Sequence, residues 1–244
     1  SIAFLGGSTG YTGTPPIPDL LSRKLNELKI KNVVYNFSVN SSNHNQHIHR
    51  LVKFMNYPFD IVVFYGGNNE TIQYLQYETR PSYPYNYFIK NEIPIYKIFL
   101  LKYSSIFGLI ENKFGIISGI SKHRNQIKLN FDTWSDNIVE NYINSIKKAE
   151  QIFKTSIITN KCKSPIFVPI LQPVNPTNNR ESKLWSKVQM AAKKYSNLLD
   201  YSYIYKEINF FDNVHVDQKS REIISSLMVK DLQSIILNQC YKND

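Results

Sequence analysis

The chain has 244 residues, of which 42% are hydrophobic and 20% are charged. These proportions are typical of a globular protein and exclude a disordered one, and the length is enough to bury a full core. The 29 Lys and Arg residues outnumber the 19 Asp and Glu residues, and the resulting net charge of +10 favours acidic partners without choosing among nucleic acid, lipid and glycan.

The first part of the chain alternates between short apolar runs and amphipathic segments. Residues 2–5 form an apolar run that predicts a strand, and two glycines end it. Residues 15–28 predict a helix because their leucines recur at helical spacing. The next strand and helix are expected over residues 33–37 and 44–55.

The same alternation continues to the end of the chain. Residues 60–65 (DIVVFY) are predicted as a strand, and after Asp60 they are continuously apolar, as in strands that are covered on both faces. The remaining elements are expected as helices over residues 136–155, 181–195 and 218–237 and as strands over residues 165–171 and 198–203. Strands that alternate with helices predict a parallel sheet with helices on both faces, a three-layer α/β fold. No run of about 18 apolar residues occurs, so no membrane-spanning helix is expected.

Residues 71–133 interrupt this rhythm, and they are too long for an ordinary connection. We expect an insertion that acts as a lid over the site, within a single domain of residues 1–244. Three of its tyrosines alternate along the chain: Tyr83, Tyr85 and Tyr87. In extended form they would present one face that can stack on a sugar ring. Residues 95–110 are apolar with isolated lysines, which suits either a lid helix docked on the core or an amphipathic helix associated with a membrane surface.

The chain has two cysteines, Cys162 and Cys240. Two are too few for a disulfide framework or a cysteine-rich zinc site, whereas a single bridge between them stays open. The chain begins with Ser1 directly before the first expected strand, so we expect that a tag, a signal peptide or an anchor has been removed upstream.

The loop after the first strand, Gly6-Gly7-Ser8-Thr9-Gly10-Tyr11-Thr12-Gly13, fits several motifs. Its glycines match the G-x-x-G-x-x-G spacing of a dinucleotide site, where a helix N-terminus holds pyrophosphate. Three prolines follow at once, however, and proline beyond the first turn breaks the helix that this site needs. In addition, none of the 17 tyrosines has a lysine four residues later, which is the pair that such dehydrogenases use.

The loop also contains the G-x-S-x-G pattern of a nucleophile elbow, formed by Gly6, Ser8 and Gly10. In α/β-hydrolases that elbow lies in the middle of the domain after several strands. Here it ends the first strand, which argues against this fold.

Four short motifs in order account for the chain better. They are Gly6-Gly7-Ser8-Thr9 after the first strand, Asn36-Phe37-Ser38-Val39-Asn40-Ser41 after the second, Gly66-Gly67-Asn68-Asn69 after the third and Asp212-Asn213-Val214-His215 before the last helix. Together they resemble blocks I, II, III and V of the SGNH (GDSL-type) hydrolases, a family that keeps its blocks in this order. The Gly-Gly-Ser-Thr form with a long insertion is similar to bacterial members of envelope and surface-polysaccharide systems.

The resemblance implies a flavodoxin-like fold with five parallel strands in the order 2-1-3-4-5 and a site at their carboxyl ends. It implies a catalytic triad in which Ser8 is the nucleophile, His215 the base and Asp212 the residue that orients it. The backbone N–H groups of Ser8 and Ser41 and the side-chain amide of Asn68 would stabilise the oxyanion. This chemistry proceeds through a Ser8 acyl-enzyme and needs no cofactor and no metal.

Two residues depart from the family pattern, and one competes with a triad member. Ser41 stands where the family usually has Gly, which is tolerable if the backbone angles suit a residue with a side chain. Asn69 stands where the family usually has Asp, and this puts the local loop geometry in question. Asp217 could orient His215 instead of Asp212, but the three-residue spacing favours Asp212.

The function expected from the resemblance is that of a serine esterase acting on an acylated, in particular acetylated, carbohydrate. An O-acetyltransferase that uses the same triad on a surface polysaccharide, a lipid esterase and a degenerate scaffold that only binds glycan all stay open. The expected partner is an acylated small molecule or glycan and not nucleic acid. The expected location is the cell envelope or another extracytoplasmic compartment.

His44, His47 and His49 also invite a metal hypothesis. His44 and His47 share a helix face, but His49 points elsewhere, and no cysteine or paired carboxylate completes the set. We therefore expect solvated helix residues and no metal site.

Overall fold

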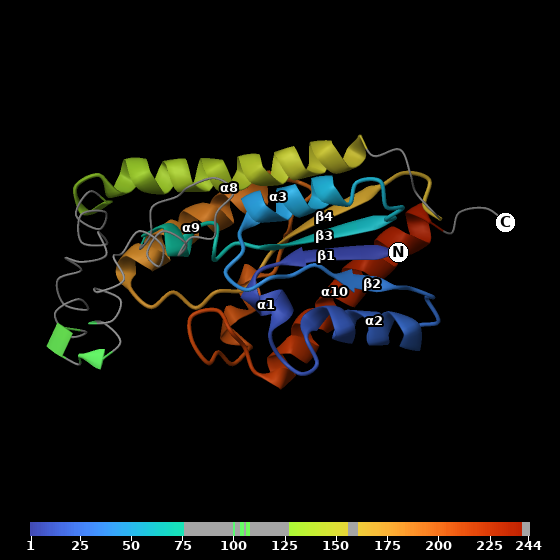
Figure 1. The fold of residues 1–244 in the computed structure, drawn as a ribbon, viewed down its shortest axis with the longest axis horizontal. Coiled ribbons are helices and arrows are strands. Elements are labelled where there is room, and N and C mark those ends of the chain that lie inside the picture. Colours follow the sequence, from blue (N-terminus) through green and yellow to red (C-terminus); the bar gives the residue numbers. More distant parts are fainter. Residues whose placement is uncertain (76–99, 101–102, 105, 108–126, 156–160, 241–244) are drawn as a thin grey trace.

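The computed structural model describes residues 1–75, 100, 103–104, 106–107, 127–155 and 161–240 (Figure 1). The strands are β1 (Ile2–Gly6), β2 (Val34–Asn36), β3 (Ile61–Gly66), β4 (Ile166–Leu171) and β5 (Leu199–Asp200). The α-helices are α1 (Ser8–Tyr11), α2 (Ile17–Glu27), α3 (His44–Lys53), α8 (Phe131–Lys154), α9 (Asn179–Lys194) and α10 (Gln218–Gln239). Two short 3-10 helices are η1 (Ile72–Leu75) and η2 (Ser202–Lys206).

The strands form one parallel sheet of five in the order β2-β1-β3-β4-β5. Ile2 of β1 lies opposite both Val34 of β2 and Ile61 of β3, and Ile61 lies opposite Ile166 of β4. Every residue of β1, β3 and β4 is buried, as expected for apolar strands in the middle of a covered sheet. The predicted fold class and strand order are therefore confirmed.

Helices cover both faces of the sheet (Figure 1). On one face α3, α8 and α9 bury residues such as Leu51, Tyr142 and Leu184 in a shared core. On the other face α2 and α10 bury a second core that includes Leu21 and Met228. The sheet thus separates two hydrophobic layers, and its carboxyl edge is left for the loops.

The starts of the helices follow from local sequence. Asn43 begins α3 with a capping box, in which its side chain accepts from the Gln46 N–H and the Gln46 side chain accepts from the Asn43 N–H. Asn178 begins α9 by accepting backbone N–H groups of that helix. Pro16 and Pro18 flank the first residue of α2, where no helix hydrogen bond is lost. The prolines that argue against a dinucleotide-binding helix directly after the first strand thus lie at the start of α2.

The structure differs from the sequence-based expectation at the fifth strand. That strand was predicted over residues 198–203, but β5 ends at Asp200 and η2 follows. The Asp200 side chain accepts from the Ser202 N–H at 2.9 Å, a local turn that competes with the strand. The short helix α1 was also not expected.

The insertion is described at its two ends and at a few residues between them, namely 100, 103–104 and 106–107. Its first residues form η1, and α8 begins at Phe131, before the predicted end of the insertion. The alternating tyrosines Tyr83, Tyr85 and Tyr87 and most of residues 95–110 lie outside the described residues. In the part of the chain that is described, no helix is long and apolar enough to cross a membrane.

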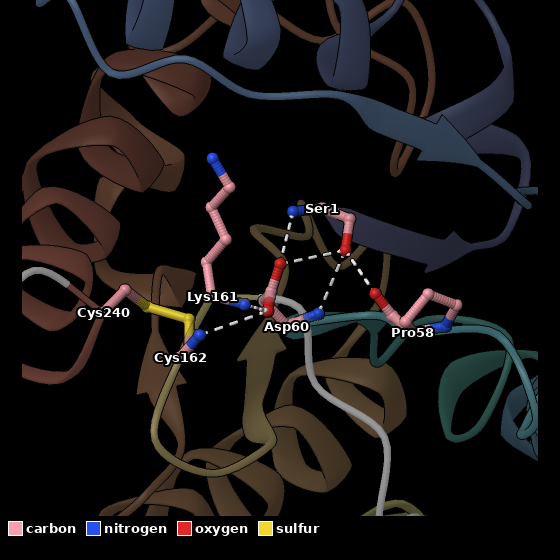
Figure 2. The surroundings of a disulfide bond; sticks show 6 residues. All are labelled: Ser1, Pro58, Asp60, Lys161, Cys162 and Cys240. Carbon is pink, nitrogen blue, oxygen red and sulfur yellow. Dashed lines mark hydrogen bonds and ion pairs between the residues drawn. A yellow bond between two sulfur atoms is a disulfide. The ribbon is translucent and has the colours of Figure 1, made fainter.

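Cys162 and Cys240 form a disulfide bond, which settles the pairing that the sequence left open (Figure 2). Beside it, Oδ1 of Asp60 accepts the backbone N–H groups of Lys161 at 2.7 Å and Cys162 at 3.2 Å. Oδ2 of Asp60 pairs with the Ser1 ammonium group at 2.7 Å. Burial raises the pKa of Asp60, but these hydrogen bonds and the Ser1 charge outweigh it and hold the pKa below its usual value. This cluster lies at the amino end of the sheet, opposite the predicted site.

Candidate active site

The predicted site residues follow the carboxyl ends of neighbouring strands. Ser8, Ser41 and Asn68 lie in the loops or turns that follow β1, β2 and β3, and β1 lies between the other two strands. Gln172, which the sequence analysis did not single out, follows β4. Because all these strands run parallel, their carboxyl ends meet at one edge of the sheet.

Ser8, His215 and Asp212 are joined in one chain of hydrogen bonds. The Ser8 Oγ lies 2.8 Å from Nε2 of His215, and Nδ1 of His215 lies 2.6 Å from Oδ2 of Asp212. An ionised carboxylate only accepts hydrogen bonds, so the proton of a neutral imidazole belongs on Nδ1. This tautomer leaves Nε2 as an acceptor that faces the Ser8 hydroxyl.

The loop before α10 holds the Asp212 carboxylate in place. Its Oδ1 accepts the backbone N–H groups of Val214 at 2.8 Å and His215 at 2.7 Å. Burial works to raise the pKa of Asp212, but the hydrogen bonds from His215 and Val214 outweigh burial and keep the pKa below its usual value. The carboxylate is therefore charged at neutral pH, and its 51% exposed side chain is partly solvated as well.

Asp217, the competing candidate for this role, has a different task. Its Oδ1 accepts the Ser220 N–H at 2.8 Å and caps α10. Its Oδ2 accepts from the Asn209 side chain at 3.2 Å. The structure thus brings Asp212, and not Asp217, to the imidazole.

Helix α1 fixes the position of Ser8. The Thr12 backbone N–H and hydroxyl both donate to the Ser8 carbonyl, at 2.7 and 2.8 Å. The buried Thr9 hydroxyl donates to Oε1 of Gln172 at 3.1 Å, which connects the start of α1 to the end of β4. A Cβ at Gly10 would lie 2.5 Å from the Ser38 Oγ and 2.9 Å from the Phe4 ring, so glycine is needed at this close approach.

The block II and block III loops are tied to each other. Ser41 has a φ of +59°, so it adopts the left-handed conformation for which the family uses Gly. The Asn69 Nδ2 donates to the Ser42 carbonyl at 2.7 Å, directly after Ser41. An Asp at position 69, the residue that the family usually has, could not donate this hydrogen bond. Asn69 therefore has a physical role that Asp could not fill.

Asn68 lies between these features and is 2% exposed. Its Nδ2 makes only a long contact of 3.4 Å to Oδ1 of Asn69. The backbone carbonyl of Asn68 accepts the N–H groups of Thr71 and Gln73, and these hydrogen bonds fix the turn that carries Asn68. The side-chain amide is therefore a buried donor with spare capacity at the carboxyl end of β3.

Glu70 anchors the same turn and was not anticipated. Its Oε2 accepts the Gly67 N–H at 2.7 Å, and Gly67 has a φ of +137° that suits glycine. Burial raises the pKa of Glu70 to about 7. Backbone hydrogen bonds, including those from Gly67 and His44, work in the opposite direction and lower this pKa, but burial outweighs them. In the sequence, the only signal is a carboxylate two residues after Asn68.

The expectation of solvated histidines is wrong for two of the three. His44 is 1% exposed and His47 is 0% exposed, whereas His49 is exposed. The shared face of His44 and His47 packs on Phe64 of β3, because the start of α3 lies over the sheet. Glu70, 26 residues after His44, joins them, and one ligand atom from each of the three side chains lies within 4.8 Å of the others. The sequence could not predict this, since the carboxylate comes from another element.

No family model and no curated protein sequence matches this chain. Solved structures do. A gut microbial diltiazem-metabolizing enzyme, BT4096, superposes with a TM-score of 0.52 at 12% identity over 94% of this chain, which spans 46% of that chain. A lipase from a goat rumen metagenome gives a TM-score of 0.52 at 14% identity and covers 93% of this chain and 94% of its own. An acetyl xylan esterase, AlAXEase, gives 0.51 at 11% identity and covers 95% and 98%.

The superposition extends over nearly all of this chain in each case. At these identities the likeness concerns the fold. Together with the sheet order, it shows that the chain has the fold of the SGNH hydrolases.

Proposed function

We propose that this protein is a serine esterase of SGNH type, with Ser8 as its nucleophile. The observation that carries the proposal is the continuous hydrogen-bond chain from the Ser8 Oγ through His215 to Asp212. A serine hydroxyl needs an adjacent base to attack at neutral pH, and Nε2 of His215 lies 2.8 Å away.

The reaction follows from these contacts. The Ser8 Oγ attacks the ester carbonyl while its proton passes to Nε2 of His215, and Asp212 stabilises the imidazolium that forms. The tetrahedral intermediate collapses, the C–O bond to the alcohol breaks, and the imidazolium returns its proton to the leaving alkoxide. Water then attacks the acyl-Ser8 ester with His215 again as base, which releases the carboxylic acid and restores Ser8.

The oxyanion is stabilised by donors that follow three adjacent strands. These are the backbone N–H groups of Ser8 and Ser41 and the side-chain amide of Asn68. Buried, preorganised donors contribute most where charge develops in the transition state. The hydrogen bond from Asn69 to Ser42 and the anchoring of the Asn68 turn by Glu70 support this preorganisation.

An acetylated carbohydrate is the substrate class that we favour. The side chains of His215 and Asp212 are 32% and 51% exposed, and two exposed aromatic side chains adjoin the triad in sequence. Tyr11 is 58% exposed one turn after Ser8, and Phe211 is 76% exposed directly before Asp212. Exposed aromatic rings suit stacking on sugar rings better than they suit enclosure of an acyl chain. One structural neighbour is an acetyl xylan esterase, while another is a lipase.

A serine-directed fluorophosphonate probe tests the nucleophile. The wild-type protein should be labelled and should hydrolyse a short-chain aryl ester, and Ser8→Ala should lose both properties while its melting temperature is kept. Ser226→Ala, at an exposed serine of α10, is the matched control and should behave as wild type. A Ser8→Ala variant that keeps most of its esterase activity would refute the assignment, and a wild-type protein that is not labelled would favour a binding scaffold.

Mass spectrometry of acyl products tests the substrate. Incubation with an acetylated xylan should release acetate faster than incubation with a long-chain aryl ester releases fatty acid. Acetate that appears on an added acceptor glycan, and not in water, would make the protein an O-acetyltransferase. A preference for the long acyl chain would make it a lipid esterase.

A further inference from the structure

A buried cluster away from Ser8 remains unexplained by ester hydrolysis. It consists of His44 and His47 on α3 and Glu70 after β3, and all three side chains are buried. These residues lie on the α8 side of the sheet, where the His44 ring stacks on Tyr142 at 5.3 Å between centroids. Buried ionisable groups without a matching partner are costly, so their arrangement calls for a reason.

The hydrogen bonds of His44 determine which nitrogen is free. The Ser145 hydroxyl donates to the Tyr142 carbonyl at 2.7 Å, so its hydrogen is already used. Ser145 must therefore accept from Nδ1 of His44, which lies 3.1 Å away. This places the proton on Nδ1 and leaves Nε2 as a bare lone pair. Among the residues that the structure describes, Nε2 of His44 has no hydrogen-bond partner.

The bare Nε2 faces a carboxylate. Oε1 of Glu70 lies 3.9 Å from it, which is too far for a hydrogen bond. The other carboxylate oxygen, Oε2, is already occupied by the Gly67 N–H. The ionised Glu70 carboxylate, which also accepts backbone N–H groups of Gly67 and His44, thus presents a lone pair toward Nε2. An electron-pair acceptor between the two groups would satisfy both.

His47 can supply a third lone pair. Among the described residues, neither ring nitrogen of His47 has a hydrogen-bond partner, and a neutral imidazole carries one unprotonated nitrogen. The candidate ligand atoms of His44, His47 and Glu70 lie within 4.8 Å of one another.

We propose that His44, His47 and Glu70 bind a divalent transition-metal ion of the Zn²⁺ class. Two imidazole nitrogens and one carboxylate oxygen are a known donor set for Zn²⁺, with bonds of about 2.0–2.2 Å that set tetrahedral ligand atoms about 3.3–3.5 Å apart. The 3.9 Å between His44 and Glu70 needs only a small closure to reach this spacing. The hydrogen bond from Nδ1 of His44 to Ser145 is the outer contact that orients a metal-binding imidazole.

The surroundings provide a path and a fourth position. A cavity of about 240 Å³ is lined by His44 and Glu70 and also by Tyr74, Asn141, Tyr142 and Lys148. Asn141 and Lys148 are exposed, so the cavity reaches the surface of α8. A water molecule in it can complete the coordination of the ion. The ion would also fix Glu70 and, through the Gly67 N–H, the turn that carries Asn68.

Metal titration of the purified protein tests this site independently of any esterase activity. After treatment with a chelator and its removal, the protein should bind one equivalent of Zn²⁺ in competition with a chromophoric chelator. Co²⁺ in the same place should give the strong visible absorption of a site with low coordination number. Ser8→Ala should bind both ions as wild type does, so that failure of the proposed catalytic role leaves the result unaffected.

Variants assign the ligands. His47→Ala and Glu70→Gln should each weaken binding at least 100-fold, whereas His49→Ala, on the same helix but exposed, should bind as wild type. His215→Ala removes the imidazole of the proposed triad and should not change the stoichiometry. Melting curves identify a variant that does not fold, and the wild-type Co²⁺ spectrum then decides alone. No stoichiometric binding, the weak spectrum of a hydrated ion, or undiminished binding by folded His47→Ala would each overturn the site.

Discussion

The side-chain amide of Asn68 gives the most specific test at the scale of a single residue. If it donates to the oxyanion, Asn68→Ala should lower kcat by about 100-fold or more, about 3 kcal/mol, with little change in KM. Asn68→Asp should be at least as damaging, because it replaces a donor with a negative charge beside the forming oxyanion. Steady-state kinetics on both variants measure the effect.

The control for both Asn68 variants is a measurement of whether they still fold. Both variants should give melting curves close to that of wild type if the residue acts mainly in the transition state. In a purely structural turn, Asp is accepted about as well as Asn. An Asp variant with near wild-type kcat would therefore remove the oxyanion role.

The charge of Asp212 predicts a distinct pH dependence. Its pKa lies below the usual range, so the carboxylate is present above that range and is lost only as the pH falls through the depressed value. Activity should fall toward acid pH because His215 must be neutral to act as base, while Asp212 stays charged throughout this fall. Asp212→Asn should change the pH profile of kcat/KM, because the imidazole loses its charged partner.

The same variant should also lower kcat, by about 10³- to 10⁴-fold. An amide whose oxygen keeps the backbone N–H groups of Val214 and His215 turns its NH₂ toward Nδ1. The ring proton then moves to Nε2, which can no longer accept the Ser8 proton. Asp217→Asn is the matched control: it keeps an oxygen that can cap α10 and should leave the pH profile of kcat/KM unchanged. An equal shift in both variants would contradict the role of Asp212.

The residues that the sequence could predict are those whose neighbours are fixed by the chain itself. Asp212 and His215 lie three residues apart, and Ser8 and Asn68 each follow a strand at once, so strand order alone brings them to one edge. Gln172 and Glu70 could not be predicted, because their partners come from other elements. The burial of His44 and His47 depends on where α3 lies on the sheet, which helical periodicity alone does not specify.

At the scale of elements, the contact between α1 and the loop after β2 can be tested at Gly10. A Cβ there would lie 2.5 Å from the Ser38 Oγ and 2.9 Å from the buried Phe4 ring. Gly10→Ala should lower the free energy of unfolding by about 1–3 kcal/mol, the usual cost of overpacking. It should also reduce esterase activity, since Ser8 begins the same short helix. Chemical denaturation and ester hydrolysis measure the two effects.

A second substitution identifies the cause. Ser38→Gly removes the nearest atoms, so Gly10→Ala combined with Ser38→Gly should be less destabilised than the sum of the two single variants. Additive losses would show that the Ser38 contact is not what requires glycine.

The helices and strands themselves could largely be predicted from the sequence. β1, β3 and β4 are continuous apolar runs, and α2 places its leucines at helical spacing, so local pattern and final burial agree. β5 is shorter than predicted because the Asp200 side chain turns the chain into η2. A prediction from hydrophobic periodicity could not place this end of the strand, because it depends on a single side-chain hydrogen bond.

At the scale of the whole molecule, the two ends of the sheet have separate tasks. The carboxyl end carries Ser8, Asn68 and His215, while the amino end carries Asp60 and the Cys162–Cys240 bond (Figure 2). The bond thus places a covalent cross-link at the opposite end of the sheet from the proposed chemistry.

The last prediction concerns this bond. It joins residues 78 apart and closes a loop that contains β4, α9, β5 and all of α10, so it restricts the unfolded chain. Reduction should lower the free energy of unfolding by about 4 kcal/mol in the chain-entropy estimate for a loop of this size. Because the bond lies at the opposite end of the sheet from Ser8, kcat at a temperature well below melting should stay unchanged. Urea denaturation and ester hydrolysis, with and without reductant, measure both quantities.

A variant that carries Cys162→Ser and Cys240→Ser together is the control and should show the lowered stability without responding to reductant. Equal stability of the oxidised and reduced wild type would show that the bond does not stabilise the fold, and loss of kcat on reduction would show that the two ends of the sheet are coupled.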